Sequence, residues 1–253
     1  MNSAEPDGRV AIVTGGSGAL GSAYCRALAG AGYRVVIAGR SGDGALAREI
    51  CEAGGSAITV QADVSEREST EAMAREVLEA FGRIDVLVNN AAYFSHIQKR
   101  PFDEIEDDEW DRIFAVNVRG SWLCACAVTP AMKEQGSGRI INIASMAFRG
   151  GAVPGFAHYA ASKAAIIGLT RALARELGPF GIAVNTVSPD YVAHDGELFR
   201  RQPAMAQTLA EQRCFKREQT PEDVVGAVVF LAGDDSGFIT GQDIWVNGGR
   251  IFS

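Results

Sequence analysis

Tyr159 and Lys163 are the pair of side chains in this sequence whose types and spacing most clearly suggest acid/base chemistry. They lie four residues apart in a run from about Ala157 to Gly178 that consists of helix formers without a proline, so both should share one helix face. A free phenol has a pKa of about 10 and exchanges protons poorly near neutrality. A nearby ammonium favours the phenolate, so we expect Lys163 to lower the pKa of Tyr159. The spacing alone is also common on ordinary helix surfaces, and its meaning depends on what the fold places beside it.

The elements that must position this pair alternate between strand and helix along the chain. Continuous apolar runs predict strands at Val10–Val13, Arg34–Ala38, Ile58–Val60, Ile84–Val88, Arg139–Ile143, Ile182–Val187 and Asp243–Val246. The first helical pattern follows the glycine-rich turn and runs to about Gly30. Further helical patterns lie at Ala45–Ala53, Glu66–Phe81, Asp107–Gln135, Ala157–Gly178 and Pro221–Leu231, and a polar segment from Ala193 to Gln219 interrupts the alternation. Strands that are apolar throughout are covered by helices on both faces. The pattern predicts one α/β domain over residues 1–253, built on a doubly wound parallel sheet.

A glycine-rich turn follows the first predicted strand, at Thr14–Gly21. Its Gly16-x-Gly18-x-x-Gly21 spacing fits the dinucleotide-binding pattern, in which small residues let the backbone approach a pyrophosphate at a helix N-terminus. Ligands of such sheets bind beyond the carboxyl ends of the strands. A turn that merely packs is the alternative, and the strand–turn–helix context favours phosphate binding.

Composition limits the classes of function. The chain has 253 residues, 47% of them apolar, and a net charge of −7 without a basic cluster, which argues against a nucleic-acid partner. The opening residues are polar and acidic, unlike a signal peptide, and no uninterrupted apolar run reaches the roughly 18 residues that span a bilayer. The five cysteines have no metal-like spacing, and we interpret them as free thiols. We therefore expect a soluble cytoplasmic protein without a membrane partner or a metal site.

Further short motifs follow the later strands in chain order. They include Asp63-Val64 after the third strand and Asn89-Asn90-Ala91-Ala92 after the fourth. With these residues the chain resembles the short-chain dehydrogenase/reductase family, in its short single-domain branch, nearly from end to end, and the resemblance implies a Rossmann fold. The matching residues are Thr14, Gly15, Gly21, Asp63, Val64, Asn89, Asn90, Ala91, Asn117, Ser145, Tyr159 and Lys163.

The resemblance implies a catalytic set of Asn117, Ser145, Tyr159 and Lys163. Ser145 can donate a hydrogen bond to the substrate oxygen where negative charge develops. Tyr159 gives that oxygen a proton during reduction or removes one during oxidation. By analogy with the family, Lys163 holds the nicotinamide ribose and Asn117 anchors a water. The alternative for Asn117 is a polar side chain that satisfies a helix distortion.

The resemblance also implies a nicotinamide cofactor. Its contacts are expected at Gly15, Ser17, Gly18, Ala19, Leu20, Gly21, Arg40, Asp63, Val64, Asn90, Ala91, Tyr159, Lys163, Pro189, Val192 and His194. An acidic residue after the second strand would bind a ribose 2′-hydroxyl, whereas an arginine favours a 2′-phosphate. That position is Gly39, followed by Arg40, which favours NADP(H). NAD(H) stays possible because Asp43 is close by and Arg40 could be a solvated loop charge.

The sequence departs from the family pattern in several places. Ala19 and Ala92 replace glycines, Asp190 replaces a flexible glycine after the sixth strand, and His194 replaces a threonine near the nicotinamide amide. The segment at about 190–219 corresponds to the substrate loop, where Leu198, Phe199, Met205 and Leu209 could close over a ligand. Candidate pocket-wall residues, each more typical of ordinary loop packing, are Phe94, His96, Phe148, Arg149, Phe156 and Tyr191.

The sequence therefore favours an NADP-dependent carbonyl reductase or alcohol dehydrogenase acting on a small ketone or secondary alcohol. A 3-oxoacyl-(acyl-carrier-protein) reductase is one alternative, although no basic cluster is present to dock an acidic carrier. A non-catalytic NADP(H)-sensing protein is an alternative of another class, against which the complete set of Ser145, Tyr159 and Lys163 argues. The family analogy implies a homotetramer, or a homodimer.

Overall fold

Seven parallel strands form a single sheet in the order β3-β2-β1-β4-β5-β6-β7. The computed structural model describes residues 8–42, 44–94, 97–149, 154–193 and 203–252. The strands are β1 (Val10–Thr14), β2 (Arg34–Gly39), β3 (Ser56–Gln61), β4 (Val86–Asn89), β5 (Gly138–Ile143), β6 (Ile182–Pro189) and β7 (Asp243–Val246). The strand order reverses between β1 and β4, which creates a crevice at their carboxyl ends.

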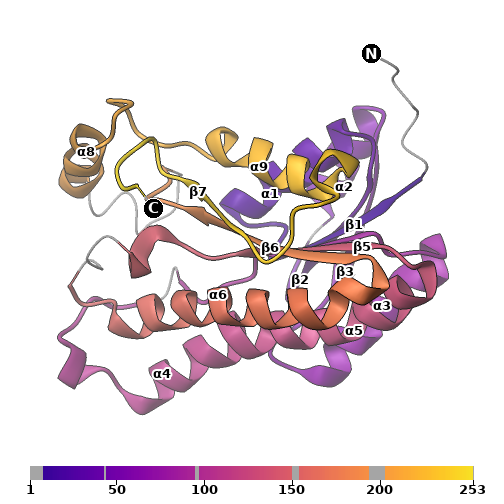
Figure 1. Ribbon diagram of the computed structural model, residues 1–253, viewed down its shortest axis with the longest axis horizontal. Coiled ribbons are helices and arrows are strands. Elements are labelled where there is room, and N and C mark those ends of the chain that lie inside the picture. The colour runs from indigo at the N-terminus through magenta and orange to yellow at the C-terminus, as the bar shows by residue number, and fades with distance from the viewer. Residues whose placement is uncertain (1–7, 43, 95–96, 150–153, 194–202, 253) are drawn as a thin grey trace.

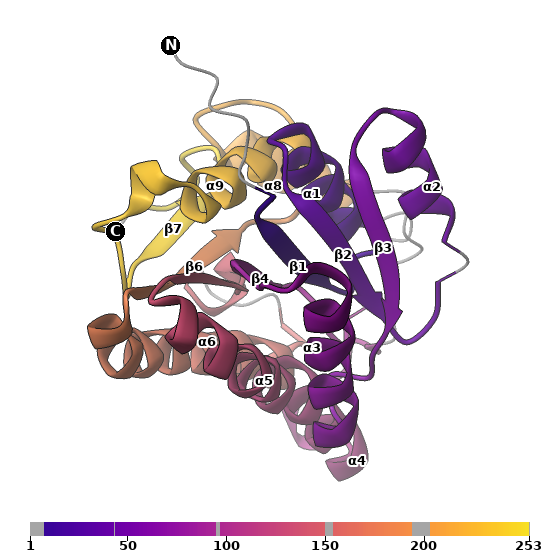
Figure 2. The same ribbon diagram turned by 90° about the vertical axis from the view of Figure 1, so that its right-hand side faces the viewer.

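Helices cover both faces of the sheet (Figure 2). One face carries α1 (Ala19–Gly30), α2 (Ala45–Glu52) and α9 (Glu222–Ala232); the other carries α3 (Arg67–Phe81), α5 (Gly120–Gln135) and α6 (Ala157–Leu177). A separate buried apolar cluster lies on each face, which is why the central strands are apolar throughout. The predicted doubly wound α/β sheet is confirmed, and the predicted strands and major helices are present with shifts of a few residues at their ends.

Two features of the fold differ from the sequence-based expectation. The polar segment that follows β6 contains a further helix, α8 (Pro203–Gln212), which lies at one end of the molecule, apart from the helices that cover the sheet (Figure 1). The predicted helix at Asp107–Gln135 is continuous, but it consists of α4 (Asp107–Phe114), a π-helical turn (Ala115–Arg119) and α5. The π-turn inserts one extra residue into a helical turn and thereby redirects the side chains around Asn117.

The helical stretch Asp107–Gln135 is also, by length and composition alone, apolar enough to cross a membrane. No other helix of the described residues passes this test. Of its most apolar window, 44% is buried inside the fold, and Cys124, Val128 and Met132 belong to the core beside the sheet. A core helix of a folded domain meets the same criterion, so the stretch is weak evidence for a membrane span.

A buried chain of polar side chains joins the sheet to α6, the helix that carries Tyr159. Asn89 of β4 donates through Nδ2 to Oδ1 of Asn142 on β5 over 2.9 Å. Asn142 donates in turn to the Thr170 hydroxyl of α6 over 2.8 Å, and Thr186 of β6 donates to the same hydroxyl, also over 2.8 Å. All four side chains are buried. Such a chain fixes how α6 lies along the sheet, because a shifted helix would leave these polar groups without partners.

We expect Asn142→Ala to destabilise the protein by more than about 2 kcal/mol, since each polar group left unpaired in the interior costs about 1–3 kcal/mol. The free energy of unfolding in urea measures the effect. Ile141→Val, on the same strand with a side chain that is also buried, is the matched control and should cost about 0.5–1.5 kcal/mol. An Asn142→Ala variant no less stable than Ile141→Val would show that the polar chain contributes little.

Candidate active site

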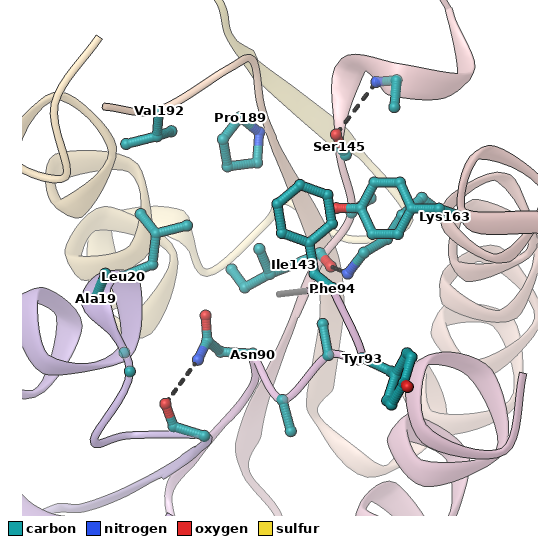
Figure 3. A pocket seen from close by; sticks show the side chains of 18 of the residues that line it. Ala19, Leu20, Asn90, Tyr93, Phe94, Ile143, Ser145, Lys163, Pro189 and Val192 are labelled. Atoms are coloured by element: carbon teal, nitrogen blue, oxygen red, sulfur yellow. Dashed lines mark hydrogen bonds between the residues drawn. The ribbon is translucent and has the colours of Figure 1, made fainter. Parts of the chain in front are cut away.

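An elongated pocket of about 950 Å³ runs along the carboxyl edge of the sheet. At one end it is lined by the glycine-rich turn between β1 and α1 and by the residues that follow β2 and β3. At the other end it is lined by the residues after β5 and β6, the start of α6, and α8. Figure 3 shows Ala19, Leu20 and Asn90 facing Ser145 and Lys163 across this space.

The glycine-rich turn is shaped by close backbone contacts. Gly15 has a φ of 62°, a conformation that favours glycine, and a Cβ on Gly21 would overlap the carbonyl oxygen of Gly15. Gly18 caps the N-terminus of α1 without a side-chain hydrogen bond, so the first N–H groups of the helix are available to a ligand. A helix N-terminus that the backbone can approach this closely fits the pyrophosphate of a dinucleotide.

Asn90 holds the glycine-rich turn in place. Its Nδ2 donates to the carbonyl oxygens of Thr14, at 2.9 Å, and Gly15, at 3.1 Å. The Thr14 hydroxyl accepts from the backbone N–H groups of Asn90 and Ala91, each at 3.1 Å. Asn90 therefore orders the backbone of the phosphate turn, and Figure 3 shows its side chain bonded to the turn.

Asn117 lies in the π-helical turn, and its side chain connects two other elements. Its Oδ1 accepts from the backbone N–H of Tyr93 over 2.7 Å, and its Nδ2 donates to the Ser162 hydroxyl over 3.0 Å. Ser162 donates to the carbonyl oxygen of Tyr159 over 2.8 Å. The helix distortion that we considered as the alternative for Asn117 is present, but the hydroxyl of Ser121 bonds the Asn117 carbonyl within it. Asn117 thus ties the segment after β4 to the first turn of α6.

Ser145, Tyr159 and Lys163 all line the pocket. Ser145 follows β5, and its Oγ accepts from the backbone N–H of Ala147 over 3.2 Å. Lys163 is buried, and its Nζ donates to the carbonyl oxygen of Ile143, the last residue of β5, over 2.7 Å (Figure 3). The ring of Phe94 packs against that of Tyr159 with 4.7 Å between their centroids.

The protonation of the pair differs from the sequence-based expectation. Burial raises the pKa of Tyr159 to about 12, although a hydrogen bond with Ser145 acts in the opposite direction. Burial also lowers the pKa of Lys163 to about 8. The expected lowering of the Tyr159 pKa is therefore wrong. The physical reason is that desolvation of the phenolate outweighs the attraction of an ammonium that is directed at the Ile143 carbonyl.

The other predicted cofactor-contact residues lie along the same pocket, with one exception. Those that line it are Gly15, Ser17, Gly18, Ala19, Leu20, Gly21, Arg40, Asp63, Val64, Asn90, Ala91, Tyr159, Lys163, Pro189 and Val192. His194 lies outside the described residues, as do Asp43, His96, Leu198 and Phe199. The pocket therefore brings together residues from the ends of six strands, β1 to β6, that are far apart in the sequence.

The predicted pocket wall is only partly present. Phe94, Phe156, Tyr191, Met205 and Leu209 line the pocket. Phe148 packs instead against a small apolar cluster, and the Arg149 guanidinium lies 4.9 Å from the Trp245 ring centroid, so neither is among the pocket-lining residues. For these two residues the interpretation as ordinary packing was correct.

Sequence reasoning missed several residues that line the pocket, including Arg112, Gln212 and Arg250. Arg112 belongs to α4, with its guanidinium 5.9 Å from the Tyr93 ring centroid. Gln212 is the last residue of the unpredicted helix α8, and Arg250 lies after β7. No spacing rule marks them, because they reach the pocket through tertiary packing.

The substrate-loop segment is tied together at its base. Val192 forms an isolated bridge with Gln219, and the backbone N–H of Ala193 donates to the Gln219 carbonyl over 2.6 Å. Gln219 also donates through Nε2 to the carbonyl oxygen of Val246 on β7 over 2.7 Å. Both ends of the segment are therefore fixed to the sheet next to the pocket.

Comparison with known proteins gives matches over nearly the whole chain. A family model described as enoyl-(acyl carrier protein) reductase matches residues 16–250. The short-chain reductase protein NovJ of Streptomyces niveus is 39% identical over 249 residues, which is 95% of this chain and 93% of that protein. A 3-oxoacyl-[acyl-carrier-protein] reductase of Synechocystis sp. is 37% identical over 247 residues, 96% of this chain and 97% of that protein.

Solved structures give similar matches. A gluconate 5-dehydrogenase of Burkholderia cenocepacia, in complex with NADP and tartrate, is 33% identical with a TM-score of 0.90, covering 97% of this chain and 96% of that one. A protein of Beutenbergia cavernae described as an NAD(P)-dependent gluconate 5-dehydrogenase, with NADP bound at low occupancy, is 40% identical with a TM-score of 0.88, covering 96% of both chains.

The buried ammonium of Lys163 should make stability depend on pH in a defined direction. Its pKa is about 8 in the folded protein and 10.5 in the reference state, so between these values the folded protein binds fewer protons and becomes more stable as pH rises. Lys163→Met removes this titration. We expect the unfolding free energy of the unmodified protein, relative to this variant, to rise by about 1.4 kcal/mol per pH unit in that range.

Denaturant unfolding of both proteins at a series of pH values measures the difference between their unfolding free energies. The contributions of the other titrating groups cancel in this difference. Lys133→Met, which replaces an exposed lysine of α5, controls for the loss of a lysine in general. Parallel stability curves for the unmodified protein and Lys163→Met would contradict the expected desolvation of the ammonium.

Proposed function

Because this chain belongs to the short-chain dehydrogenase/reductase family, we propose that it reduces a small ketone or aldehyde, or oxidises the corresponding alcohol, with NADP(H) as cofactor and Tyr159 as acid/base. Members of this family are oxidoreductases that act on CH–OH and carbonyl groups. One observation supports the assignment most strongly: the side chains of Ser145, Tyr159 and Lys163 line the same pocket as the turn that precedes α1. A carbonyl held between the two regions would meet a proton donor and a hydride donor at once.

The roles of the protein side chains follow from their positions. Tyr159 carries its proton at neutral pH, since burial raises the pKa of its phenol, and this is the form needed to protonate a substrate oxygen during reduction. Ser145 donates a hydrogen bond to the same oxygen, where negative charge develops. Lys163 is buried, and its ammonium is bonded to the Ile143 carbonyl. It places a positive charge near Ser145 and Tyr159.

Asn117 orders the reacting groups through the backbone. Its bonds to the N–H of Tyr93 and to Ser162 hold the segment after β4 against the first turn of α6. We assign to it the positioning of Tyr159, in addition to the water-anchoring role expected from the family resemblance.

The cofactor supplies the hydride. The N–H groups at the start of α1 would hold its pyrophosphate, Asp63 and Val64 its adenine, and Lys163 its nicotinamide ribose. Pro189 and Val192 would contact the nicotinamide. Arg40, which lines the pocket beyond the end of β2, would bind the 2′-phosphate that distinguishes NADP(H) from NAD(H). The two similar solved structures contain NADP, which supports this choice.

A 3-oxoacyl-(acyl-carrier-protein) reductase is the second candidate, and the names of several relatives favour it. The net charge of −7 and the lack of a basic cluster in the sequence argue against docking of an acidic carrier protein. Turnover of small ketones and of carrier-bound 3-oxoacyl thioesters can be compared directly. We expect the free ketones to be the better substrates. A cytoplasmic location and a homotetrameric or homodimeric assembly stay predictions from the family.

Tyr159→Phe should reduce kcat by about 100-fold to 10,000-fold, the range that a general acid contributes, while cofactor binding is retained. The phenyl ring preserves the packing against Phe94, so the loss reports on the hydroxyl alone. Initial rates with a ketone panel and fluorescence titration with NADPH measure the two effects.

Tyr24→Phe is the matched control for that substitution. Tyr24 belongs to α1 and is fully buried, and its hydroxyl has no hydrogen-bond partner within the described structure, so its removal should leave turnover unchanged. Near-normal turnover in Tyr159→Phe would exclude the proposed mechanism, and a non-catalytic cofactor sensor would then be the better interpretation.

Arg40→Ala should raise the KM for NADPH about 10-fold to 100-fold and change the KM for NADH little, because a charge-assisted bond to phosphate contributes about 1.5–3 kcal/mol. Steady-state kinetics with both cofactors measures the ratio. Arg48→Ala, on α2 and outside the pocket lining, is the control and should affect neither cofactor. Equal effects of Arg40→Ala on both cofactors would show that Arg40 does not recognise the phosphate.

A further inference from the structure

Asp190, the residue that replaces a glycine of the family pattern, is the centre of a compact ion cluster. It follows β6, and it accepts hydrogen bonds from two arginines. Arg250, beyond β7, donates through Nε to Oδ2 and through Nη2 to Oδ1, both over 2.8 Å. Arg213, directly after α8, donates to Oδ2 through Nη2 over 3.1 Å and through Nε over 3.3 Å.

The cluster is largely removed from solvent and carries unequal charges. The exposed fractions of the side chains are 4% for Asp190, 3% for Arg213 and 12% for Arg250. Asp190 is the one carboxylate within salt-bridge distance of either arginine in the described parts of the chain. Within the described residues, two guanidinium groups therefore share a single carboxylate, and one positive charge has no anionic partner there. A desolvated positive charge attracts an anion much more strongly than a solvated one.

The two arginines differ in their relation to the pocket. Arg213 uses its remaining donors on backbone carbonyls, with Nη1 bonded to Arg217 over 3.0 Å and Nη2 to Tyr191 over 2.9 Å, and it is not among the pocket-lining residues. Arg250 lines the pocket, and its contacts with Asp190 use only one edge of the guanidinium. No contact with another described residue engages the edge formed by Nη1 and the second Nη2 hydrogen, and this edge matches a carboxylate with two parallel bonds.

The surroundings of Arg250 make this edge a recognition element. Tyr191, Met205 and Leu209 line the same end of the pocket and offer mainly apolar surface. A wholly apolar substrate at this end would cover the unpaired charge without compensating it, which is unfavourable. A substrate with a carboxylate would satisfy the charge, and Asp190 would hold the guanidinium in place for it.

We propose that Arg250, held by Asp190, binds a carboxylate on the substrate, so that the preferred substrates are keto acids or the corresponding hydroxy acids. This inference rests on the proposed function, since it concerns the substrate of the same pocket. Asp190 and Arg213 are positioning residues, whereas Arg250 contacts the ligand. The distance between the carbonyl and the carboxylate of the best substrate then reflects the separation of Tyr159 and Arg250 along the pocket.

The test uses NADPH and a series of keto acids in which one to four carbons separate the carbonyl from the carboxylate, each paired with its neutral carboxamide. At the best chain length, the unmodified protein should have a kcat/KM about 10-fold to 100-fold higher for the acid than for the amide, as one charge-assisted pair allows. Arg250→Gln should abolish this ratio, mainly by raising the KM for the acid. Arg250→Lys should restore part of it, because a point charge without the planar fork is retained.

Arg213→Lys is the matched control, since it disturbs the same carboxylate without facing the pocket. Any misplacement of α8 by this variant should lower activity towards acid and amide equally, and the ratio should persist. If the unmodified protein does not distinguish acid from amide at any length, or if Arg250→Gln lowers both equally, the proposal is wrong. A phosphorylated ketone that is preferred over every keto acid would likewise overturn the carboxylate assignment.

A binding measurement separates this inference from the proposed function. Calorimetry of the protein saturated with NADP⁺ should show that butanoate binds more tightly than butanamide, and that Arg250→Gln removes the difference. Turnover of ketones without this difference would leave the oxidoreductase assignment intact and exclude the anion site. Arg250-dependent binding of butanoate by a protein that reduces no carbonyl would support the anion site and exclude the proposed reaction.

Discussion

The hydrogen bond from the Lys163 ammonium to the carbonyl oxygen of Ile143 is the interaction around which the reacting end of the pocket is built. A lysine that is only 3% exposed needs a fixed partner, because burial of an unpaired ammonium is costly. Ile143 ends β5, and Ser145 follows it by two residues. The bond therefore sets α6 against β5 at one position, and this position brings Tyr159 to the same part of the pocket as Ser145.

Two buried polar connections support that position from different directions. Asn142 and Thr170 join the carboxyl end of β5 to the middle of α6, and Asn117 joins the π-helical turn to Ser162 in the first turns of α6. Hydrogen bonds of this kind specify one arrangement more sharply than apolar contacts, which tolerate small sliding movements. The helix with the proton donor is thus located by polar bonds, while the cores on both faces of the sheet supply most of the apolar burial.

The sequence was sufficient to predict whatever depends on local pattern. Apolar runs gave the strands, and glycines with fixed spacing gave the turn before α1, because each reflects a nearby physical requirement. Features that depend on distant contacts were not predictable. Helix α8 lies in a polar segment, and the bond between Arg213 and Asp190 holds the end of this helix. The direction of the shift in the Tyr159 pKa depends on burial, which no residue spacing reveals. Arg250 reaches the pocket through the same tertiary packing.

The bridge between Val192 and Gln219 also has an evolutionary consequence. It closes the substrate-loop segment at its base. Changes in the length of the segment therefore need not alter the positions of the strands. Lengthening a closed loop is inexpensive, since each doubling of its length costs only about 0.6 kcal/mol in closure entropy. Apart from Arg213, which holds Asp190, changes between these two residues can therefore be selected for new substrates while the sheet stays constant. The bonds at the base of this one loop thus help to separate the specificity of the scaffold from its stability.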